Sequence, residues 1–160
     1  MKIFFKILIL IIVAFLLALL AFAYEEHYRE FIRFLYGLLT ENKITFKNNG
    51  KYLHFASGEF ISSFTIFIIS IFLLLKGQEK SQIGRNIILG IIFLILSTLI
   101  FCYIGSNGKL MECTACDDGK RVLKFNDINY DLIFISSLII GILPTIVTEV
   151  KKRYMKKASH

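Results

Sequence analysis

Four long apolar segments, separated by polar ones, dominate the pattern of this chain. Each approaches or exceeds the roughly 18 apolar residues that cross the hydrocarbon core of a bilayer. The pattern therefore predicts an all-α integral membrane protein, a four-helix transmembrane bundle formed by one membrane domain over residues 1–160. The predicted spans are approximately 3–23, 56–75, 86–104 and 130–148, with outer loops 24–55 and 105–129, inner loop 76–85 and tail 149–160.

A helical period continues beyond the first span. Residues 25–39 place charged side chains on one face, among them Glu25, Arg29 and Arg33. The opposite face is apolar, and the pattern predicts a short amphipathic helix that lies along the membrane surface or over the mouth of the bundle. The apolar positions are Tyr28, Phe31, Ile32, Leu35, Leu38 and Leu39.

Two β-hairpins are predicted in the outer loops. Over 43–55, alternating residues flank Asn49-Gly50, the strongest short signal for a type I′ turn. Over about 109–125, strand-like KLMEC and KRVLKF flank the segment TACDDG. One hairpin alone is marginal in water, so we expect the two to pair edge to edge as an antiparallel sheet. With helix 25–39, they would form a small extracytoplasmic cap.

Composition and charge agree with a membrane protein and set its orientation. The chain is 56% hydrophobic, only 19% charged, with a mean hydropathy of +0.65 and a net charge of +7. The N-terminus, loop 76–85 and tail 149–160 together hold ten Lys/Arg and two Asp/Glu, whereas the rest holds nine and ten. This bias next to the spans predicts cytoplasmic termini in a cell or bacterial inner membrane. It also argues against a nucleic-acid surface.

The first span has an alternative interpretation as a secretory signal peptide. Lys2 and Lys6 form a basic region, an apolar run follows, and Ala21-Phe22-Ala23 resembles a cleavage site. The apolar run is long for a signal peptide, which favours a retained span over removal of residues 1–23.

The spans carry no ionisable side chain near their middles. Such groups are usually kept for ion paths, proton relays or substrates, so their lack argues against a pump, a proton-coupled transporter or an intramembrane metalloprotease. Motifs of nucleotide-binding loops, zinc proteases and serine hydrolases are also missing from the sequence. No cofactor is expected.

The pair Cys113-x-x-Cys116 in the second outer loop is the strongest candidate for chemistry. A structural disulfide is favoured, since the loop is predicted to face the oxidising side. A redox-active pair, with Cys102 as a resolving thiol, is the first alternative. It is less favoured because the acidic neighbours Glu112 and Asp117 oppose thiolate formation. The second alternative is zinc, bound by Cys113 and Cys116 with the two histidines predicted on the same side, His27 and His54.

These observations favour a non-enzymatic membrane protein that acts by binding. An accessory subunit or an immunity-type protein fits best, with a protein partner held through the outer loops and the bilayer around the spans. The enzymatic alternative is a membrane thiol–disulfide oxidoreductase that uses Cys113 and Cys116. A passive channel formed by an oligomer is the third hypothesis.

Overall fold

The computed structural model describes residues 2–47, 57–76, 78–112 and 120–158. Within these ranges, four helices are long and apolar enough to cross a membrane, which confirms the predicted class at that level. The helices are α1 (Lys2–Leu39), α2 (Gly58–Leu75), α3 (Lys80–Met111) and α4 (Tyr130–Ala158). The short elements are β1 (Ile44–Phe46), β2 (Arg121–Leu123) and the 3₁₀ turn η2 (Phe125–Asp127).

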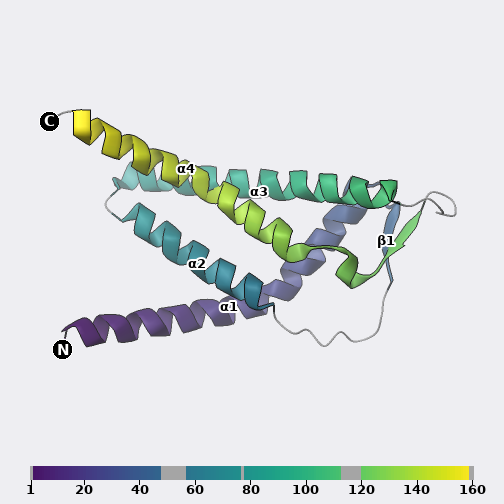
Figure 1. Ribbon diagram of the computed structural model, residues 1–160, viewed down its shortest axis with the longest axis horizontal. Coiled ribbons are helices and arrows are strands. Elements are labelled where there is room, and N and C mark those ends of the chain that lie inside the picture. The colour runs from purple at the N-terminus through teal and green to yellow at the C-terminus, as the bar shows by residue number, and fades with distance from the viewer. Residues whose placement is uncertain (1, 48–56, 77, 113–119, 159–160) are drawn as a thin grey trace.

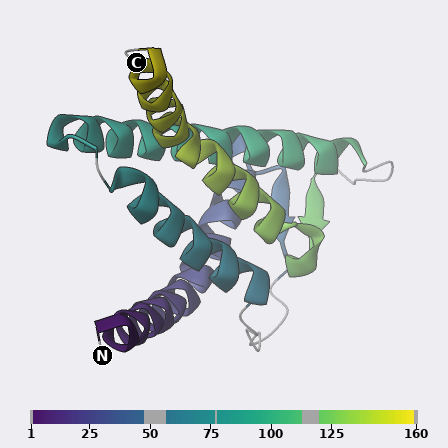
Figure 2. The same ribbon diagram turned by 60° about the vertical axis from the view of Figure 1, so that its left-hand side comes forward.

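The helices lie side by side with both chain ends at one end of the molecule (Figure 1). The turn between α2 and α3 lies there too, and we call this the terminal end. The two strands lie at the opposite end, which we call the strand end. Helix α1 bends partway: its first half diverges from the other helices, and its second half crosses behind them to the strand end (Figures 1 and 2).

The helices differ in length, and this difference creates the strand end. Helix α2 has 18 residues and α3 has 32. At 1.5 Å per residue these are about 27 Å and about 48 Å, against a hydrocarbon core of about 30 Å. Helices α1 and α3 therefore extend past the starts of α2 and α4, and their ends carry the strands.

The amphipathic helix predicted over 25–39 is not a separate element, because α1 continues through it without a break. No Gly or Pro interrupts the chain between Ala23 and Tyr36, so nothing there stops the helix. It ends after Leu39, where Glu41 and Asn42 take the left-handed conformation with φ of 52° and 60°. The backbone N–H of Asn42 then donates to the Gly37 carbonyl over 2.8 Å.

The described residues do not form the predicted cap of two hairpins paired as an antiparallel sheet. Strand β1 pairs with β2 in parallel, in a two-stranded sheet that places Thr45 opposite Val122. The first half of the second hairpin is helical instead, since α3 runs to Met111, with Lys109 in its last turn where a cation is favourable. The return of the first hairpin falls on 48–56, outside the described residues.

Close packing holds the helices together at two levels. Near the terminal end α3 crosses α4 at Gly90 and Gly141, where a Cβ atom on Gly90 would lie 2.9 Å from the Gly141 carbonyl oxygen. Nearer the strand end, the rings of Phe60 and Phe134 stack at 4.0 Å between α2 and α4. Tyr28 of α1 meets Phe134 edge-on at 5.0 Å, so three helices share this aromatic contact.

Candidate functional site

A charged cluster joins α1 to the starts of α2 and α4. Glu25 is only 5% exposed, and its carboxylate accepts both guanidinium hydrogen bonds from Arg29, the shorter at 2.6 Å. The two Glu25 oxygens also accept the backbone N–H of Ser57 at 3.0 and 3.1 Å. Arg29 Nη2 lies 3.5 Å from Asp131 in the first turn of α4. The cluster thus fixes where α2 and α4 begin.

Aromatic rings surround the same guanidinium groups. Arg29 lies 5.0 Å from the ring centre of Tyr130, and both Arg29 and Arg33 lie over Phe125, at 5.7 and 5.3 Å. Partly desolvated cation–π contacts of this kind are stabilising. Because the charges of Glu25 and Arg29 are paired and covered, removing either partner would be costly, and the cluster is poorly suited to binding a ligand from solution.

A second polar network lies at the terminal end. Asn86 is 1% exposed; its side-chain amide donates to Gln78 over 2.9 Å and accepts from the Thr148 hydroxyl over 3.1 Å. Thr148 also contacts the Pro144 carbonyl at 2.9 Å. The network ties the α2–α3 turn, the start of α3 and the proline-containing part of α4 into one unit.

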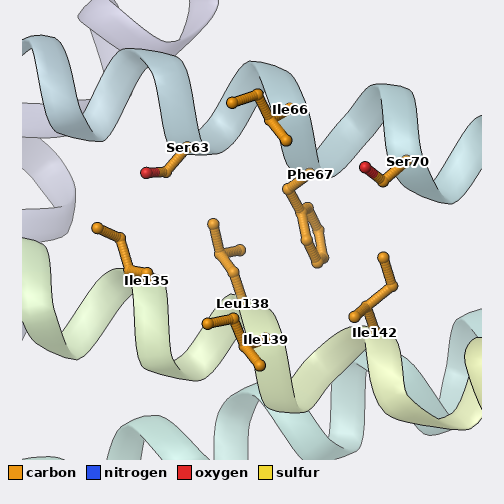
Figure 3. A pocket seen from close by; sticks show the side chains of 8 residues that line it. All are labelled: Ser63, Ile66, Phe67, Ser70, Ile135, Leu138, Ile139 and Ile142. Atoms are coloured by element: carbon orange, nitrogen blue, oxygen red, sulfur yellow. The ribbon is translucent and has the colours of Figure 1, made fainter.

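An apolar groove of about 270 Å³ separates α2 from α4 (Figure 3). Four aliphatic side chains of α4, including Ile139, form one wall, and Ile66 and Phe67 line the other. Ser63 and Ser70 of α2 lie between the two ribbons in this view. Among the described residues, neither hydroxyl has a hydrogen-bond partner. The neighbouring Ser62 differs, because its hydroxyl contacts the Glu59 carbonyl at 3.2 Å.

A wide, shallow depression of about 410 Å³ lies at the strand end, between α1 and β1. Its lining mixes charged, polar and aromatic groups, as surfaces that bind proteins often do. The contributing side chains include Glu30, Arg33, Phe34, Asn42 and Phe46.

The site residues predicted from sequence are not brought together by the described part of the structure. Cys102 is free and fully buried, in a core cluster with Tyr36 and Ile133, as a small apolar residue would be. His27 lies exposed on α1. Cys113, Cys116 and His54 lie outside the described residues. Over the described ranges, no group of three or more His, Cys, Asp or Glu side chains is placed to hold a metal ion.

Sequence reasoning missed the two polar clusters and the groove. The burial of Glu25 could have been predicted from helix periodicity. Glu25 lies seven and eleven residues before Ile32 and Tyr36, on the same helix face, and both of these residues are buried. No sequence pattern predicted the role of Asn86, because its contacts with Gln78 and Thr148 depend on the tertiary fold. The groove depends on how α2 and α4 splay, which no local pattern encodes.

Comparison of the chain with protein-family models, with curated proteins and with solved structures finds no match.

Proposed function

We propose that this is a non-enzymatic membrane protein that binds another membrane protein, as an accessory subunit or an immunity-type protein. The bias of basic residues toward the terminal end supports cytoplasmic termini and an extracytoplasmic strand end. The observation that carries the proposal is the pair of hydroxyls without partners, Ser63 and Ser70, in the α2–α4 groove.

The depth of these hydroxyls in the membrane indicates which kind of molecule fills the groove. Ser63 and Ser70 lie about 8 Å and about 18 Å along α2 from its first residue, well inside a core of about 30 Å. At that depth an acyl chain offers no hydrogen-bonding group, whereas a helix with polar or small side chains does. The groove therefore favours a transmembrane helix of a partner that carries such residues.

The depression between α1 and β1 provides a second contact on the outer side. It lies in the part of the chain where the outer loops were expected to bind a protein, and it offers Arg33 and Asn42 for polar contacts. A partner that spans the membrane beside α2 and α4 and also carries an outer segment would be bound at two levels.

Photocrosslinking in cells tests the groove. A benzoylphenylalanine replaces Ile139, which is 59% exposed and lines the groove, or the control position Ile88 on α3, which is 61% exposed. We expect one discrete protein adduct from Ile139 and none from Ile88. Combining Ser63→Ala with Ser70→Ala should lower the yield about ten-fold, since two such bonds contribute about 1.4 kcal/mol together.

Ser62→Ala is the matched control, because that hydroxyl already has a partner in its own helix. It should leave the Ile139 adduct unchanged. Adducts with lipid alone, or an adduct with twice the mass of this chain, would contradict binding of a partner protein in the groove.

A further inference from the structure

The outer half of α1 carries apolar side chains on two faces, one of which packs into the bundle through Ile32 and Leu35. Its charged residues Glu25 and Arg29 face the bundle, whereas the apolar side chains that face outward are Tyr24, Phe31, Phe34 and Leu38. These four are 60%, 50%, 62% and 59% exposed. A helix that packs on a protein in water turns such residues inward. Exposure of this face to water would therefore be unfavourable.

The outward apolar residues form one strip. Their spacing of seven, three and four residues places them along a single side of the helix. The exposed acidic residues Glu26 and Glu30 occupy the adjacent side. His27 also lies on the strip, and its ring has an apolar body with a polar tip, as interfacial residues do.

The strip continues the surface of the first span. On the same side of α1, at spacings of four, three and four residues, lie Ile9, Val13, Leu16 and Leu20, each between 45% and 57% exposed. Helix periodicity carries this side through Tyr24 to Leu38. This largely apolar surface, which includes His27, thus runs from a segment long and apolar enough to span the bilayer into the segment predicted to lie outside it.

The length of this surface explains the bend. From Ile9 to Leu38 it extends about 44 Å, whereas a bilayer core is about 30 Å thick. A span longer than the core tilts or bends to keep its apolar residues in lipid. The bend in α1 directs its second half obliquely across the strand end (Figure 2).

We propose that the face formed by Tyr24, Phe31, Phe34 and Leu38 is a lipid-binding surface, seated in the leaflet at the strand end. This face contacts lipid at the boundary between the acyl chains and the headgroups. Glu26 and Glu30 then face water, and the paired Glu25 and Arg29 lie at the depth of the interface.

Tryptophan fluorescence tests this surface directly, because the chain contains no Trp. Phe31→Trp and Leu38→Trp each introduce a single fluorophore, and Glu30→Trp is the control on the acidic side. The full-length variants are reconstituted in phosphatidylcholine–phosphatidylglycerol vesicles. Lipids brominated on their acyl chains quench from the membrane, and iodide quenches from water.

We expect brominated lipid to quench Phe31→Trp and Leu38→Trp at least three-fold more than Glu30→Trp, with the opposite order for iodide. Two strip positions are read independently, so misfolding of one variant leaves the other as a test. Strong iodide quenching at the strip would overturn the proposal in favour of a water-exposed face. Protection from both quenchers would overturn it in favour of a protein-covered one.

Discussion

The side-chain amide of Asn86 donates a hydrogen bond to the side-chain oxygen of Gln78 over 2.9 Å. Through this bond the second turn of α3 is connected to the α2–α3 turn, and Thr148 extends the connection to α4. All three partners belong to different parts of the chain, so the network fixes the packing of the terminal end.

Replacing Asn86 by leucine should destabilise the fold. Asn86→Leu keeps the branched shape and the number of side-chain heavy atoms but leaves the Gln78 oxygen and the Thr148 hydroxyl without this partner, at a cost of about 1–3 kcal/mol. Thermal unfolding in detergent measures the effect. Asn107→Ala is the control, since the side-chain amide of Asn107 donates an exposed hydrogen bond to the Tyr103 carbonyl of its own helix. Equal unfolding temperatures for the two variants would contradict a structural role for the network.

The Glu25–Arg29 pair should be far more sensitive than an exposed pair. Arg29→Gln leaves the buried Glu25 carboxylate without its countercharge, a change that costs about 3 kcal/mol. Lys109→Gln removes the exposed partner of Glu112 and should cost less than about 1 kcal/mol. Combining Arg29→Gln with Glu25→Gln should recover part of the loss, because the neutral amide oxygen still accepts the Ser57 N–H. Chemical unfolding in mixed micelles measures these free energies of unfolding. An equal loss for Arg29→Gln and Lys109→Gln would contradict the predicted ranking.

The crossing of α3 and α4 should tolerate no side chain at Gly90. A methyl group there meets the Gly141 carbonyl oxygen at 2.9 Å, so Gly90→Ala forces the helices apart and costs about 1–3 kcal/mol. Gly84 lies on the same helix with nothing within 4 Å of its added Cβ. Gly84→Ala should be neutral or slightly stabilising. We expect a lower melting temperature for Gly90→Ala than for Gly84→Ala. Equal melting temperatures would contradict the close crossing of α3 and α4 at Gly90.

The parallel strand pairing can be trapped covalently. Thr45 and Val122 are exposed register partners, and neighbouring strands are about 4.8 Å apart, within the range that a disulfide bridges. Thr45→Cys with Val122→Cys, in a chain whose Cys113 and Cys116 are serine, should oxidise nearly completely. Thr45→Cys with Lys124→Cys is two residues out of register and should oxidise poorly. A reversed preference would refute the parallel register.

Cysteine labelling separates the structural and redox hypotheses for the predicted outer pair. Cys102 is fully buried, so it should resist maleimide in the folded protein and react after SDS. A structural Cys113–Cys116 disulfide predicts one label per chain in SDS without reductant, and labels on all three cysteines of the chain after reduction. A mixed redox state in protein taken directly from cells would favour the oxidoreductase.

The sequence predicted four helices long enough to cross a membrane, because lipid imposes a simple rule. Backbone polar groups in hydrocarbon must be satisfied within the segment, so a long apolar run becomes a helix. The run around Ile7–Leu20 and the run after Asn86 carry that signal without any tertiary context.

The strand end was harder to predict because its organisation is not local. The pairing of Ile44 with Arg121 joins segments on either side of two long helices, and Asn49-Gly50 favoured a nearer partner. Over 24–39, apolar residues cover most of the helix circumference, so periodicity did not choose which side packs inward. Tertiary contacts made that choice, by pairing Arg29 with Glu25 and Asp131.

Native mass spectrometry of the protein released from its own membrane in lipid nanodiscs tests the central claim most directly. Binding in the α2–α4 groove predicts a complex of this 18.4 kDa chain with one other membrane protein, in fixed stoichiometry. Ser63→Leu, which fills the groove, should abolish that complex and leave the folded monomer. A bare monomer, or only multiples of 18.4 kDa, in the unmodified protein would contradict the account.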